Sequence, residues 1–111
     1  MPARKFQGLF SVTVTPFGAD GALDLPGFAR ILEWHIAQGS AGLAITADNG
    51  EASLLSITER QAMAETAVRV AAGRVPVIMG AMGTHAFTAA DTAKMVEVAA
   101  AAGVDAVLVS P

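Results

Sequence analysis

The sequence has 111 residues, no cysteine, a formal net charge of −3 and 53% hydrophobic residues. An apolar fraction this high predicts a packed core, and the absence of a basic stripe argues against a nucleic-acid partner. Without cysteine the chain forms neither disulfides nor cysteine-ligated metal sites. No run reaches the roughly 18 apolar residues of a membrane span and no signal peptide is recognisable, so we expect a cytoplasmic protein without membrane contact.

Strand and helix signals alternate along the whole chain. Four short apolar runs predict β-strands, at residues 9–14, 42–46, 75–79 and 105–109. The last three lack a clean alternation of polar and apolar residues, which is typical of parallel strands covered by helices. The segments between the runs predict helices near residues 26–38, 57–72 and 89–102.

Each predicted helix has a recognisable start. Asp24 is a plausible N-cap residue for the first helix, Ser56 and Glu59 form a capping-box pattern before the second, and Thr88 precedes the third. The helical period predicts three inward faces, made of Phe28, Ile31, Leu32 and Ile36, then Met63, Ala67 and Val70, then Ala93, Val96 and Ala100.

The glycines that end these helices, Gly39, Gly73 and Gly103, repeat the unit after 34 and then 30 residues. Repeated βα units of this length fit either a barrel or an open doubly wound sheet. The Gly-rich phosphate-binding turns of nucleotide folds are missing, which removes the main evidence for a nucleotide-binding open sheet. The sequence therefore predicts an α/β fold of parallel (β/α) units that form the first half of a TIM (β/α)₈ barrel.

A complete barrel has eight strands and usually about 250 residues. We therefore expect residues 1–111 to be an N-terminal half-barrel with strands 1–4, the remainder of the barrel being absent from this chain. Four strands cannot close, and the two outer ones would expose hydrogen-bonding edges. Such a chain is either part of a longer protein or a half-barrel that needs a partner.

Functional residues of parallel α/β folds gather at the carboxyl ends of the strands. Asp48, Asn49 and Gly50 directly follow the second predicted strand, and an Asn-Gly turn can aim successive backbone N–H groups at an anion. The alternative is an ordinary turn between strand and loop. His85, after the third strand, is expected to be a solvent-exposed loop residue. No cluster of histidine and carboxylates has metal-ligand spacing, so we expect no metal or other cofactor.

The chain resembles the N-terminal part of the dihydrodipicolinate synthase / N-acetylneuraminate lyase family. The run from Thr15-Pro16-Phe17 through Asp20-Gly21 to Asp24 is similar to the family's T-P-F-x-x-D-G-x-x-D, and Asp48-Asn49-Gly50-Glu51 sits where the family carries G-[ST]-T-G-E. Further similar segments are Leu55-Ser56, Gly73-Arg74-Val75-Pro76-Val77, Ala102-Gly103-Val104-Asp105-Ala106 and Ser110-Pro111. The likeness spans nearly all 111 residues in the right order.

The resemblance implies a Schiff-base-forming lyase or aldolase that acts on pyruvate or a related 2-keto acid in its full-length form, with homo-oligomeric assembly. It places the substrate carboxylate at Asp48, Asn49 and Gly50, where Asp48 and Asn49 replace the usual hydroxyl or small residues. An ionised Asp48 would repel a nearby carboxylate. Glu51 matches the motif glutamate and is expected to cap backbone N–H groups.

The family's nucleophile is a lysine on the sixth strand, and its tyrosines also lie beyond Pro111. The chain has only two lysines, Lys5 before the first strand and Lys94 on the outer face of the third helix. Neither position offers the desolvation that a Schiff-base lysine requires. We therefore expect no catalytic residue within these 111 residues. The alternative function is a non-catalytic half-barrel, either a fragment or an assembly module.

Overall fold

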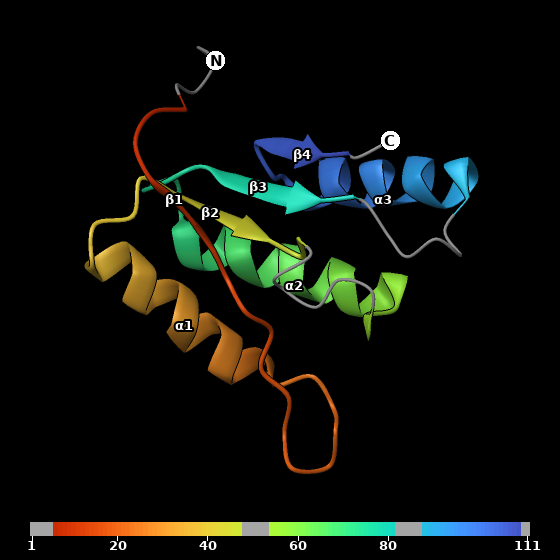
Figure 1. Ribbon diagram of the computed structural model, residues 1–111, viewed down its shortest axis with the longest axis horizontal. Coiled ribbons are helices and arrows are strands. Elements are labelled where there is room, and N and C mark those ends of the chain that lie inside the picture. The colour runs from red at the N-terminus through yellow and green to blue at the C-terminus, as the bar shows by residue number, and fades with distance from the viewer. Residues whose placement is uncertain (1–5, 48–53, 82–87, 110–111) are drawn as a thin grey trace.

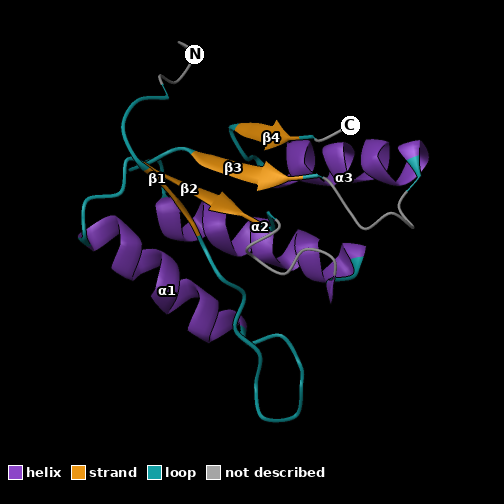
Figure 2. Cartoon of the chain, in the orientation of Figure 1, coloured by secondary structure: helices purple, strands orange, loops and turns teal. Residues whose placement is uncertain are grey.

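The computed structural model describes residues 6–47, 54–81 and 88–109. Within these residues strands and helices alternate (Figure 2). In chain order they are β1 (Phe10–Val12), α1 (Leu25–Ala37), β2 (Gly42–Ile45), α2 (Ile57–Ala71), β3 (Val77–Gly80), α3 (Ala89–Ala102) and β4 (Ala106–Leu108). Every predicted element is present. The strands are shorter than predicted, and β3 begins at Val77, after a proline that has no N–H to donate to the sheet.

The strands form one parallel sheet in the order β1-β2-β3-β4 (Figure 1). Side chains from all three helices join Leu43, Ile45, Val77 and Met79 in a single core, so the helices cover the same face of the sheet. This confirms the first half of a (β/α)₈ barrel. An open sheet of the flavodoxin type would have the order 2-1-3-4 and helices on both faces.

The helix starts are as predicted. Asp24 accepts a hydrogen bond from the Gly27 N–H at 2.9 Å, and Ser56 and Glu59 form a reciprocal capping box. Thr88 forms a second capping box with Asp91. These bonds satisfy N–H groups that have no partner inside the helix, which explains why each helix begins where the sequence indicated.

The predicted inner faces of α1 and α2 are confirmed in the main, although Ile31, Ile36 and Val70 are only partly buried, and the predicted face of α3 is wrong. Phe28 and Leu32 of α1, and Met63 and Ala67 of α2, are buried. The prediction for α3 was Ala93, Val96 and Ala100, whereas the side chains buried there are those of Met95, Val98 and Ala99. Helix α3 is apolar on nearly every side, so its period does not select one face. The long Met95 side chain reaches the core and sets the rotation of the helix.

An exposed ion pair ties α1 to the end of α2. Arg74 donates hydrogen bonds to both carboxylate oxygens of Glu33, at 3.0 and 2.6 Å. Hydrogen bonding to this guanidinium lowers the pKa of Glu33 below its ordinary value. None of the helices in the described ranges combines the length and apolarity needed to cross a membrane.

In the described residues, the sheet face that points away from the helices is most exposed at the two edges of the sheet. Val12 pairs in register with Ala44, which pairs with Ile78, which in turn pairs with Ala106. Val12 is 46% exposed at one edge of the sheet and Leu108 is 41% exposed at the other. In a complete barrel this row of small and branched side chains would fill the interior.

We therefore predict that the isolated 111 residues associate or aggregate in solution. The exposed apolar side chains of Val12 and Leu108 and the open edges of β1 and β4 both favour contact with further chains. Sedimentation velocity of the purified chain measures this directly. A monodisperse monomer across the concentration range would contradict the prediction.

Candidate functional site

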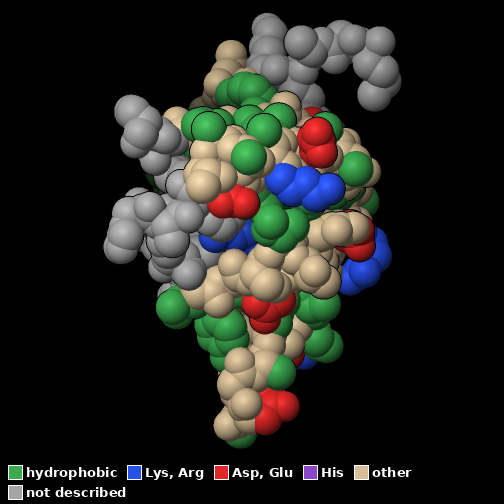
Figure 3. All heavy atoms as spheres, turned by 90° about the vertical axis from the view of Figure 1, so that its right-hand side faces the viewer, with side chains coloured by type: hydrophobic (Ala, Val, Ile, Leu, Met, Phe, Trp, Pro, Cys, Tyr) green, Lys and Arg blue, Asp and Glu red, His purple; other side chains and the backbone are tan. Residues whose placement is uncertain are grey.

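The carboxyl ends of β1, β2, β3 and β4 lie at the same edge of the sheet, because all neighbouring strands are parallel. Figure 3 looks onto this side of the molecule, where hydrophobic, acidic and basic side chains are mixed in the part not covered by grey atoms. The predicted site residues Asp48, Asn49 and Gly50 lie outside the described residues, as do Glu51 and His85. Ala47 is the last described residue before this gap.

Thr46, directly after β2, is held in an unusual conformation. Its φ is 49°, in the left-handed region that β-branched residues rarely adopt. The side chain is fully buried, and its Oγ1 donates a hydrogen bond of 3.0 Å to the carbonyl oxygen of Gly80 at the end of β3. The ends of β2 and β3 are thus joined by a side chain as well as by the sheet.

A glycine is required at position 80 because the backbone of Thr46 and Ala47 lies close to it. A Cβ atom built on Gly80 would lie 2.3 Å from the carbonyl oxygen of Thr46 and 3.1 Å from the Cα of Ala47. These are backbone atoms, which cannot swing away as the end of a side chain can. Only glycine allows the two strand ends to approach this closely.

Arg60 lies in the first turns of α2, and its exposed fraction is 1%. Its Nε donates a hydrogen bond of 3.3 Å to the carbonyl oxygen of Leu55, in the segment that leads from the candidate turn into α2. Burial lowers the pKa of the guanidinium from its ordinary value. Burying a charged group is costly unless its N–H groups find hydrogen-bond partners, and the Leu55 carbonyl oxygen is one such partner.

Lys94 lies on α3 as expected from the sequence. Its side chain is 60% exposed, and its Nζ lies 4.0 Å from a carboxylate oxygen of Glu97. This exposed position lacks the desolvation that a Schiff-base lysine requires. Lys5 lies outside the described residues. No group of three or more histidine and carboxylate side chains in the described part of the chain could hold a metal ion.

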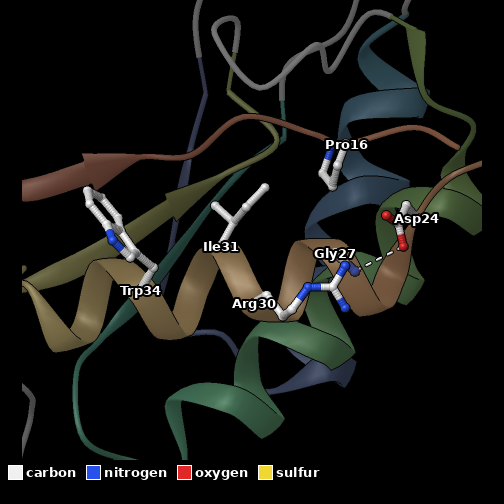
Figure 4. Close-up of a pocket in the computed structure, with 6 residues that line it drawn as sticks. All are labelled: Pro16, Asp24, Gly27, Arg30, Ile31 and Trp34. Atoms are coloured by element: carbon white, nitrogen blue, oxygen red, sulfur yellow. Dashed lines mark hydrogen bonds between the residues drawn. The ribbon is translucent and has the colours of Figure 1, made fainter.

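A pocket of about 400 Å³ lies between α1 and the segment after β1, lined by Pro16, Asp24, Gly27, Arg30, Ile31 and Trp34 (Figure 4). The Asp24 carboxylate there is engaged in capping α1. Because the one carboxylate that lines it already caps a helix, the pocket by itself does not argue for a substrate site.

Two residues of this region escaped sequence analysis. The sequence predicts Thr46 only as the last residue of a strand, since neither its positive φ nor its bond to Gly80 follows from the local sequence. Arg60 could have been found, because it lies three residues before Met63 and seven before Ala67, on the inner face of α2. An arginine on a face that is otherwise apolar is a readable signal.

Comparison with known proteins finds both similar sequences and similar structures. The sequence profile described as the Dihydrodipicolinate synthetase family matches residues 5–111. A 4-hydroxy-tetrahydrodipicolinate synthase of Gluconacetobacter diazotrophicus is 37% identical over 109 residues, which cover 98% of this chain and 36% of that protein.

Two solved structures agree with the fold described above. One is a dihydrodipicolinate synthase from Acinetobacter baumannii complexed with pyruvate, with a TM-score of 0.87, 31% identity and coverage of 95% of this chain and 35% of that one. The other is YagE, a prophage protein of E. coli K12 in complex with pyruvate, with a TM-score of 0.85, 38% identity and coverage of 94% and 34%. The chain thus spans about a third of the length of these relatives.

Proposed function

Because the chain belongs to the dihydrodipicolinate synthetase family, we propose that residues 1–111 are the N-terminal half-barrel of a lyase that forms a Schiff base with pyruvate or a related 2-keto acid. The observation that supports this proposal is the end of β2 at Ile45, three residues before Asp48 in the sequence, at the carboxyl edge of a four-stranded parallel sheet. Barrel enzymes build their active sites at that edge. Relatives of the same fold have been solved with pyruvate.

The proposed role of Asp48, Asn49 and Gly50 is to bind the carboxylate of the keto acid. Backbone N–H groups of a turn are suitable donors, and Gly50 permits the conformations that let neighbouring N–H groups converge. The Asn49 amide adds a side-chain donor. Asp48 sets the substrate range, either by repelling an anion or by accepting hydrogen bonds from a hydroxylated substrate.

The nucleophile of the proposed reaction lies outside these 111 residues. In the family resemblance it is a lysine of the sixth strand, whose amine attacks the keto carbon and forms an imine with loss of water. Lys94 is solvated and paired with Glu97, so it does not supply that amine. We therefore propose that the 111-residue chain alone is inactive, and that the complete protein is a cytoplasmic homo-oligomer without a cofactor.

The test requires a complete barrel, meaning residues 1–111 continued in one chain by the remaining strands. If the reading frame of this protein does not encode the remaining strands, they are taken from the Acinetobacter baumannii synthase and fused to residue 111. We predict that Asn49→Ala weakens pyruvate binding to this barrel by about 0.5–1.5 kcal/mol, the net value of one hydrogen bond. Gly50→Val should weaken binding more, because it distorts the turn. Titration calorimetry measures both changes.

Asp48→Thr separates the two roles open to Asp48. If the aspartate excludes pyruvate by its charge, the threonine variant binds pyruvate more tightly than the parent barrel. If the aspartate instead binds a hydroxylated 2-keto acid, the variant loses that ligand and gains little for pyruvate. Unchanged affinity for every 2-keto acid tested, in all three variants, would mean that residues 48–50 have no part in binding.

A further inference from the structure

We propose that Thr46 is a positioning residue, whose hydroxyl fixes the direction in which the chain leaves β2 and enters residues 48–50. This inference rests on the proposed function, since it assumes that those residues bind the keto acid. Thr46 touches no substrate in this account. It acts on Asp48, Asn49 and Gly50 through the backbone that it holds.

The first argument is the double contact between Thr46 and Gly80. The Oγ1 of Thr46 donates to the Gly80 carbonyl oxygen at 3.0 Å. The Thr46 carbonyl oxygen packs on the Cα side of the same glycine, where a Cβ would lie only 2.3 Å away. Side chain and backbone of one residue are thus both fixed against β3, which leaves the following peptide little freedom to turn.

The second argument is the backbone conformation. A φ of 49° is unfavourable for a β-branched residue such as Thr46, so the surrounding structure must hold it there. The adjacent residues of β2 are extended, and Ile45 pairs in register with Met79. The change from extended to left-handed backbone therefore occurs at Thr46 itself. It redirects the chain one residue before Ala47 and two before Asp48.

The third argument is that burial strengthens the hydroxyl contact. Thr46 is 0% exposed, so water does not compete for its hydrogen bond. Valine has nearly the same shape and the same branching, but it cannot donate. Thr46→Val therefore removes the bond with little change in packing, and Thr46→Ser keeps the hydroxyl.

The chain offers a matched control in Thr66. It is 3% exposed and donates a partly buried hydrogen bond of 2.8 Å to the carbonyl oxygen of Ala62 within α2. Thr66→Val removes a comparable bond away from the ends of the strands. Both valine variants are made in the complete barrel, together with Thr46→Ser and Thr46→Gly. Glycine adopts a positive φ without strain, so this variant remains informative if the valine variant fails to fold.

Two readouts are measured in every variant: the dissociation constant for pyruvate, and hydrogen exchange of the amides of residues 47–51. Thr46→Val and Thr46→Gly should raise the dissociation constant about three- to tenfold, the equivalent of one lost hydrogen bond, and speed the exchange. Thr46→Ser and Thr66→Val should leave both within about twofold of the parent, since neither removes a bond at the end of β2.

The positioning role is overturned if Thr46→Val and Thr66→Val have the same dissociation constant and the same exchange rates. If Thr46→Val does not fold, Thr46→Gly takes its place in this comparison. The exchange readout needs no ligand, so it decides the role of Thr46 even if the parent barrel binds no pyruvate. A parent barrel that binds no pyruvate would contradict the proposed function instead. Faster exchange without a change in affinity would show that Thr46 orders the turn but that the turn does not bind the ligand, which also overturns the inference.

Discussion

Gly80→Ala should destabilise the complete barrel by about 3 kcal/mol, the upper range for forcing an extra methyl group into a packed site. The added Cβ would lie 2.3 Å from the Thr46 carbonyl oxygen and 2.9 Å from the carbon bonded to it. Relief requires the ends of β2 and β3 to separate, which breaks the hydrogen bond between Thr46 and Gly80. Urea titration followed by circular dichroism measures the loss.

Gly18→Ala is the matched control. A Cβ on this exposed glycine would approach only the end of the Asp20 side chain, at 3.0 Å, and the Ala22 carbonyl oxygen, at 3.7 Å. We expect a change of no more than about 0.5 kcal/mol, as for other surface substitutions. Equal stabilities for the two alanine variants would show that the close approach at Gly80 does not exist in the protein.

Arg60→Ala should cost about 2–5 kcal/mol in unfolding free energy, as for other large-to-small substitutions in a core. The variant loses the hydrogen bond to the Leu55 carbonyl and leaves the space of a side chain that is 1% exposed. Its effect should reach the segment before α2, because Leu55 is itself buried and belongs to the core. Chemical denaturation of the complete barrel gives the value.

Arg69, on the exposed side of the same helix, supplies the comparison. Arg69→Ala removes the same charge and the same side-chain volume from α2 without opening a cavity. Its expected effect is within about 0.5 kcal/mol. A similarly small effect of Arg60→Ala would contradict the burial of the Arg60 guanidinium.

The sequence predicted the elements well because short-range chemistry decides them. Capping residues such as Ser56 and Thr88 satisfy N–H groups within one helical turn, so the start of a helix is visible in a few residues. The strand order also followed, because repeated βα units leave few topologies. The rotation of α3 did not follow, since its apolar residues surround the helix and the choice of Met95 depends on the packed core.

The candidate site was only partly accessible to the same reasoning. The place of residues 48–50 after a strand could be predicted from the alternation of elements and from the family motif. The role of Thr46 could not, because its hydrogen bond joins residues that are 34 positions apart. Nothing in a single apolar strand indicates that the next residue will adopt a positive φ. Long-range contacts of this kind appear only once neighbouring strands are placed.

The most direct test of the central claim is reduction with borohydride in the presence of pyruvate, followed by mass spectrometry. We predict one carboxyethyl adduct per complete barrel, on a lysine that lies beyond residue 111. The 111-residue chain alone should show none on Lys5 or Lys94, the only lysines that it has. A complete barrel that binds pyruvate yet gives no adduct, or stoichiometric labelling of Lys94, would contradict the account.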